Sequence, residues 1–106
     1  MNYQEAIKLF KKKLKEIYGE RLVDIILYGS LARNEQEKES DIDLLVLLKN
    51  YKNYWDEVHR IGDIEFEINS YFDFKVLISA VPALAKDFKS KKTPLFLNIK
   101  REGISV

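Results

Sequence analysis

Hydrophobic residues in the first half of the chain follow helical spacing once and strand spacing twice. Residues 3–18 carry apolar side chains at steps of three and four, which predicts an amphipathic helix with Asn2 as a candidate N-cap and Gly19 as its stop. Residues 22–28 (LVDIILY) and 42–48 (IDLLVLL) are short, nearly continuous apolar runs. Such runs are typical of strands covered on both faces. We expect the polar segment between them to be a solvated loop.

Residues 54–72 carry two overlapping patterns. Their apolar positions fit a helical stripe, but Ile64, Phe66 and Ile68 also alternate with glutamates as a half-buried strand would. We favour one long helix over this whole segment.

The last third of the chain predicts a strand and one or two helices. Residues 74–81 (FKVLISAV) indicate a third strand stopped by Pro82, after which a short helix can begin. Thr93 and Pro94 are typical of an N-cap and first helical residue, and Gly103 is placed to end that helix. The order helix, strand, loop, strand, helix, strand, helix predicts a small α/β fold with helices packed on a mixed β-sheet.

Length and composition predict one globular domain over residues 1–106. The charged fraction is 33% and the hydrophobic fraction 46%, and no segment approaches the roughly 20 apolar residues of a membrane span. The N-terminus lacks the pattern of a secretory leader and there are no cysteines, so we expect a cytoplasmic protein without disulfides. A net charge of +1 argues against a broad nucleic-acid-binding surface, and we interpret the local lysine runs as solvated helix faces.

Two aspartates open the second strand. Asp41 and Asp43 would project from one face of a strand with Cα atoms about 6.6 Å apart, close enough to repel each other. A divalent cation between them would remove this conflict, and hard oxygen ligands favour Mg²⁺ or Mn²⁺ over zinc. The single histidine, His59, is expected to be a surface or packing residue of its helix.

A glycine and a serine end the first strand. Gly29 lets the backbone approach a ligand closely, and Ser30 offers a hydroxyl and an N–H group suited to a phosphate, to which Arg33 could add a charged fork. Each residue also has an ordinary structural explanation, as a turn residue, a helix cap and a surface charge. Their combination with the acidic pair, eleven residues after Ser30, favours metal-assisted phosphate chemistry.

The segment YGSLARNEQEKESDIDLLVLL resembles the signature of minimal nucleotidyltransferases of the DNA polymerase β superfamily, in which GS is followed by S-D-hydrophobic-D and an apolar strand. The resemblance implies the small nucleotidyltransferase fold and a reaction in which an NTP with Mg²⁺, ATP being the expected donor, gives its nucleoside monophosphate to an acceptor hydroxyl. It assigns the triphosphate to Gly29 and Ser30 with Arg33 nearby, the metals to Asp41 and Asp43, and loop ordering to Ser40.

The third carboxylate of that family should lie on the strand after the long helix. Asp73 is the only carboxylate there, and Lys75 takes the next position on the same face. If Asp73 faces the site, the metal and catalytic set Asp41, Asp43 and Asp73 is complete. If Lys75 does, the chain could bind a nucleotide and transfer slowly.

The resemblance also suggests an acceptor. Proteins of this kind often act as the antitoxin of a two-protein module by adding AMP to a helical HEPN-type toxin. The alternative is an antitoxin that neutralises its partner by binding alone. Transfer to RNA or to a small molecule such as an aminoglycoside is a third hypothesis, and the sequence leaves open whether the chain forms a homo-oligomer.

Overall fold

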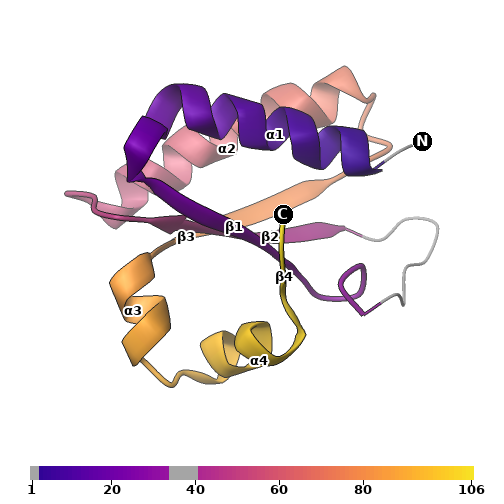
Figure 1. Ribbon diagram of the computed structural model, residues 1–106. Helices are drawn as coiled ribbons and strands as arrows, with labels where there is room; N and C mark the ends of the chain where they lie inside the picture. Colours follow the sequence, from indigo (N-terminus) through magenta and orange to yellow (C-terminus); the bar gives the residue numbers. More distant parts are fainter. Residues whose placement is uncertain (1–2, 34–40) are drawn as a thin grey trace.

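A computed structural model of the chain describes residues 3–33 and 41–106. Four strands form one mixed sheet in the order β3-β2-β1-β4, in which β1 runs antiparallel to β2 and β4, and β2 runs parallel to β3. Helices α1 and α2 cover one face and α3 and α4 the other (Figure 1). The mixed α/β architecture is therefore confirmed. The elements are α1 (Tyr3–Tyr18), a 3₁₀ turn (Gly19–Arg21), β1 (Leu22–Tyr28), β2 (Ile42–Leu48), α2 (Tyr54–Tyr71), β3 (Ile78–Leu84), α3 (Ala85–Ser90), α4 (Pro94–Glu102) and β4 (Ile104–Ser105).

The two faces of β2 build two separate cores. Even-numbered residues such as Leu44 and Val46 are fully buried against α1 and α2, whereas Leu45 and Leu47 pack against Ile99 on the side of α3 and α4. Burial on both faces explains the nearly continuous apolar sequence of this central strand. At about 25 cal/mol per Å² of buried apolar surface, these cores supply the main driving force for folding.

The third strand differs from the sequence expectation. It was expected at residues 74–81 with Pro82 as its stop, but β3 runs from Ile78 to Leu84 and contains Pro82 opposite Val46. The prediction was wrong because β3 lies at the edge of the sheet, where a proline costs no ladder hydrogen bond on the open side. The short helix accordingly begins at Ala85 rather than directly after the proline.

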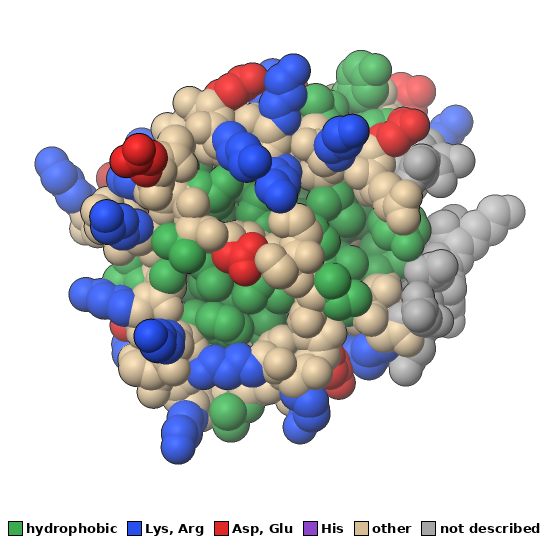
Figure 2. All heavy atoms as spheres, in the orientation of Figure 1, with side chains coloured by type: hydrophobic (Ala, Val, Ile, Leu, Met, Phe, Trp, Pro, Cys, Tyr) green, Lys and Arg blue, Asp and Glu red, His purple; other side chains and the backbone are tan. Residues whose placement is uncertain are grey.

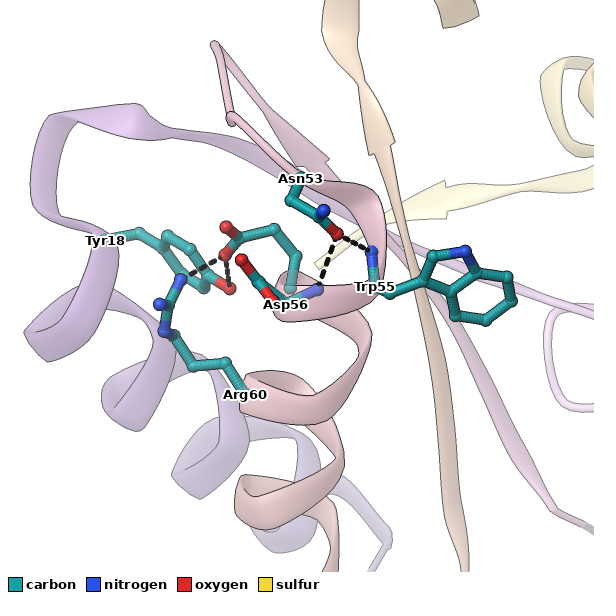
Figure 3. Close-up of polar contacts among 6 residues, drawn as sticks. Tyr18, Asn53, Trp55, Asp56 and Arg60 are labelled. Atoms are coloured by element: carbon teal, nitrogen blue, oxygen red, sulfur yellow. Dashed lines mark hydrogen bonds and ion pairs between the residues drawn. The ribbon is translucent and has the colours of Figure 1, made fainter.

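The other predicted helices are confirmed. Residues 54–71 form the single long helix α2, whose N-cap Asn53 accepts hydrogen bonds from Trp55 N (2.9 Å) and Asp56 N (3.2 Å) (Figure 3). Thr93 caps α4, Pro94 is its first residue and Gly103 ends it. The N-cap proposed at Asn2 lies outside the described residues.

A buried carboxylate joins the two helices of the upper layer. Glu57 of α2 accepts a hydrogen bond from the Tyr18 hydroxyl of α1 (2.7 Å) and forms an ion pair with Arg60 (Figure 3). Burial and the bond to Glu57 raise the pKa of Tyr18 to about 12, so its hydroxyl remains a donor at neutral pH. The pair therefore fixes α1 against α2 with the buried charge satisfied.

Lysine side chains cover the outer surface of α1. Lys12 and Lys15 are exposed, and Lys11 donates from Nζ to the carbonyl of Val106 (3.0 Å). Figure 2 shows Lys and Arg side chains standing out around a central hydrophobic area on the face that carries α1, β1 and β4. Within the described part of the chain, no helix is long and apolar enough to cross a membrane.

Helix α2 also shields the open edge of β3. Asn69 accepts from Ile78 N (2.9 Å) and donates to Ile78 O (3.4 Å), while one turn earlier Glu65 accepts from Ala80 N (2.8 Å). Burial raises the pKa of Glu65 and the bond from Ala80 opposes that rise. Polar side chains thus replace the missing neighbour strand at this edge.

We expect Asn69→Ala to lower the free energy of unfolding by about 1–3 kcal/mol, because the substitution leaves a part-buried backbone N–H without its acceptor. Urea unfolding at pH 7 measures this. The control is Asn98→Ala on the exposed surface of α4, where a change below about 0.5 kcal/mol is expected. Equal effects of the two substitutions would contradict a role for Asn69 at the strand edge.

Candidate active site

The bend after β1 lies directly against Asp43. Tyr28, the last residue of β1, is the cross-strand partner of Asp43 in β2, and Gly29 follows with a φ of +77°. A Cβ atom built on Gly29 would overlap Oδ2 of Asp43 and lie 3.4 Å from its Cγ. Glycine is therefore required here twice, for the left-handed backbone and for the close approach of the carboxylate.

The two aspartates interact electrostatically at the start of β2. Asp41 precedes the strand and is exposed, whereas Asp43, its second residue, is half-buried. Burial raises the pKa of the Asp43 carboxyl group, and the charge of Asp41 raises that pKa further. The structure therefore places the Gly29 bend against the Asp43 carboxylate, with Asp41 close enough for its charge to act on the same group.

This arrangement fits a divalent cation that arrives with a phosphate ligand. Mg²⁺ is typically held by one or two carboxylates together with substrate phosphates rather than by a cage of protein ligands. Asp41 and Asp43 supply two such carboxylates, and a cation beside them would offset the mutual repulsion that raises the pKa of Asp43. Because Gly29 has no Cβ, the Asp43 carboxylate lies directly against the backbone of the bend.

Ser30 and Arg33 belong to the turn that follows Gly29. The Arg33 amide donates to the Gly29 carbonyl (3.3 Å), and Leu31 between them is buried. The Arg33 guanidinium donates from Nη1 to Glu102 of α4 at 3.0 Å. This turn is thus linked to the C-terminal helix. Ser40, the remaining predicted residue, lies outside the described residues.

The structure does not bring Asp73 to the acidic pair. Asp73 and Lys75 lie in the turn between α2 and β3, both exposed, and Asp73 has a φ of +54°. Among residues 3–33 and 41–106, no three His, Cys, Asp or Glu side chains are grouped closely enough to hold one metal ion. The expectation that one of the two faces the site assumed a strand beginning near residue 74, and β3 begins at Ile78.

Three neighbours of the acidic pair were missed in the sequence. In the parallel ladder Asp43 pairs with Ser79, and the amide of Ile42, between the two aspartates, donates to the carbonyl of Leu77 (2.8 Å). On the other side is Tyr28, whose pKa is raised by burial and then by the charge of Asp43. Leu77 and Ser79 are identified only by the pairing of β2 with β3, so no local motif could have found them, whereas Tyr28 directly precedes Gly29 in the quoted segment. His59 lies exposed on α2, as expected.

A mixed sheet with a glycine bend against an acidic pair agrees with the nucleotidyltransferase fold that the sequence resemblance implied. The model of the nucleotidyltransferase domain family matches residues 7–99. The chain belongs to this family. It is 32% identical over 106 residues to "Putative protein adenylyltransferase MJ0141" of Methanocaldococcus jannaschii, covering all of both chains. A second protein of that organism, "Putative protein adenylyltransferase MJ0604", is 39% identical over 67 residues, which are 63% of this chain and 53% of the relative. The chain thus spans about half of that second relative.

Solved structures share the fold at lower sequence identity. A toxin-antitoxin crystallised with AMP-PNP superposes with a TM-score of 0.62 at 23% identity, covering 91% of this chain and 68% of the other. An MNT antitoxin in complex with the tri-AMPylated HEPN toxin of Shewanella oneidensis gives a TM-score of 0.54 at 20% identity, with coverages of 94% and 70%. A structure named as a minimal nucleotidyltransferase is covered over 97% of its length, with a TM-score of 0.61 and 20% identity. The predicted family and fold are confirmed.

We expect Gly29→Ala to destabilise the chain more than Gly19→Ala. Both glycines have positive φ, and a left-handed alanine costs about 1–2 kcal/mol, but only at Gly29 would the new methyl group also displace the Asp43 carboxylate. Nothing lies within 4 Å of a Cβ at Gly19, so that variant isolates the backbone effect. Thermal unfolding of the two variants measures the difference, and equal losses would show that the contact with Asp43 does not constrain position 29.

We expect Asp43→Asn to be more stable than the parent chain at pH 7. A carboxyl group whose folded pKa is raised binds its proton more tightly when folded, so the stability it contributes is present below the unfolded value of 3.8 and is lost as pH rises through the raised pKa. Asparagine does not ionise, so the advantage of the variant should shrink as pH falls toward 3.8. Unfolding curves from pH 3.5 to 7 measure this, with Asp63→Asn on the exposed face of α2 as control. If the variant is no more stable than the parent at pH 7, the expected cost of a buried, repelled carboxylate at position 43 is contradicted.

Proposed function

We propose that the chain is a metal-dependent nucleotidyltransferase that moves AMP from ATP to an acceptor hydroxyl on a HEPN-type protein. The observation that carries the proposal is the contact between the Gly29 bend and Asp43, with the charge of Asp41 acting on the same carboxylate. This contact supports the proposal because a turn of small residues is suited to binding phosphate and carboxylate oxygens are suited to binding a hard cation. Membership of the nucleotidyltransferase domain family supports the reaction class.

Each residue has a role in this proposal. Asp41 and Asp43 hold Mg²⁺ or Mn²⁺, which when bound supplies positive charge to the triphosphate. Gly29 and Ser30 bind phosphate oxygens through N–H groups and a hydroxyl. Arg33 exchanges Glu102 for a phosphate oxygen, and the loss of this partly exposed ion pair costs only about 0–1 kcal/mol.

The reaction itself is a substitution at phosphorus. The acceptor oxygen forms a bond to the α-phosphorus of the nucleotide, and the bond from that phosphorus to the β-phosphate oxygen breaks. Pyrophosphate leaves with the electron pair, and the hydroxyl proton is lost to solvent. Transfer of AMP to a protein is supported by the names of the relatives, which are called protein adenylyltransferases, and by the AMPylated toxin in the complex that shares this fold.

One observation favours a second function, an antitoxin that acts by binding alone. The residues that flank the acidic pair on this side are Leu77, just before β3, and Ser79 in β3, so neither adds a carboxylate beside Asp43. With fewer carboxylates the site would hold a cation less tightly and transfer would be slower. Binding of the partner would not depend on that loss.

We expect the purified chain to label a HEPN-type protein from the same genome when supplied with Mg²⁺ and ATP labelled at the α-phosphate. Asp43→Asn should reduce the rate by about 100-fold or more, because in this proposal it removes one of the two charged ligands that hold the metal ion. Chelation of the metal should abolish labelling. Asp56→Asn, which changes an exposed carboxylate in the first turn of α2, should leave the rate within about twofold.

The same assay distinguishes the two functions. Neutralisation of the toxin without any label, unchanged in Asp43→Asn, would refute transfer and support neutralisation by binding alone.

A further inference from the structure

Two phenylalanines form an exposed aromatic patch at the end of α2. Phe66 on the helix is 67% exposed and Phe74 in the following turn is 52% exposed. Their ring centroids lie 5.9 Å apart with the planes tilted by 59°. Leu77, also exposed, follows three residues after Phe74. Large apolar side chains that touch each other in water are typical of protein interaction sites. We call Phe66 and Phe74 the aromatic patch.

The backbone that presents Phe74 is strained. Asp73 and Phe74 have φ values of +54° and +58°, two consecutive left-handed residues neither of which is glycine. Such conformations cost on the order of 1–3 kcal/mol each and concentrate at functional positions. Hydrogen bonds hold the turn in place, from Phe74 N to Asn69 O (2.7 Å) and from Asp73 N to Ser70 O (3.0 Å). The strained turn therefore holds the Phe74 side chain on the surface, where it gains little free energy from burial.

The patch lies at the same end of the sheet as the acidic pair. Strands β2 and β3 are parallel, so the turn that enters β3 is beside the start of β2 (Figure 1). The hydrogen bond from Ile42 N to Leu77 O (2.8 Å) joins this turn to the residue between Asp41 and Asp43. A protein resting on the patch would therefore have part of its surface close to the acidic pair.

Charges around the patch restrict what could bind there. Asp63 lies one helical turn before Phe66, Asp73 precedes Phe74 in the chain, and Asp41 lies beyond Leu77, all exposed. Lys75 is the cation within this segment. Carboxylates of this kind repel nucleic acid and anionic lipid, and pairing with a second copy would bring like charges together. They complement a protein surface that carries lysine or arginine.

We propose that the aromatic patch is the docking site for the acceptor protein, which presents an apolar surface edged by basic residues and so brings its hydroxyl to Asp41 and Asp43. This inference rests on the proposed function and names the partner surface that it needs. Paired aromatic side chains are common energetic centres of such interfaces. Docking and transfer then depend on different residues of the chain.

The test is the affinity of the full chain for a HEPN-type protein from the same genome, measured by isothermal titration calorimetry. We expect Phe66→Ala combined with Phe74→Ala to raise the dissociation constant by about 10- to 100-fold, which is the effect of losing an energetic centre of the interface. The matched control is Trp55→Ala, which removes an equally exposed aromatic residue (66%) from the other end of α2 and should change the constant less than about twofold. Unfolding temperature and affinity for ATP with Mn²⁺ should be unchanged in both variants.

The outcomes separate docking from catalysis. No binding by the parent chain, a double variant within about twofold of the parent, or an equal loss in Trp55→Ala would each overturn the docking site. Labelling of the partner by the parent together with unaffected binding of the double variant would support transfer and reject docking at this patch. Binding that depends on the patch without any labelling would support docking and reject transfer.

Discussion

Antiparallel pairing of β1 with β2 is the constraint on which the candidate site depends. It sets Tyr28 opposite Asp43 and so places the Gly29 bend against the Asp43 carboxylate. The register is fixed by burial, because a slip of one residue would turn Asp43 toward the core formed by α1 and α2 and would turn Leu44 and Val46 away from that core. Residues such as Leu44 and Val46, which never meet a substrate in the proposed mechanism, therefore determine where the carboxylate points.

Helix α2 and β3 provide the second half of the same geometry. Glu65 and Asn69 bind the backbone of β3 at its open edge, so the position of the helix along the sheet sets where the strand begins. Because the crossover is parallel, the end of the helix and the start of β3 meet the start of β2. The strained turn at Asp73 and Phe74 completes this connection. An element that mainly protects an edge strand thus also determines what surrounds the acidic pair.

The sequence was most informative where periodicity and local chemistry agreed. It predicted α1, β1, β2, α2 and α4, and it identified Gly29, Asp41 and Asp43 as neighbours, because strand alternation and glycine conformation are local properties. It failed where the outcome depends on position in the sheet. Pro82 was taken as a stop because its edge location is not encoded nearby, and β4, at two residues, is too short to leave a pattern. Asp73 was placed on a strand because left-handed backbone at two residues that are not glycine has no sequence signature.

Separation of the acidic pair from the aromatic patch explains how one fold can serve both proposed functions. The pair depends on β1 and β2, whereas the patch depends on α2 and the turn that follows it. Loss of a carboxylate would affect cation binding, whereas the packing of Phe66 on Phe74 is a contact between two aromatic rings. A binding antitoxin could therefore retain the partner surface of a transferase. The acidic pair itself argues against such a loss in this chain. Asparagine at position 43 would remove the repulsion with Asp41, but the chain has aspartate at both positions.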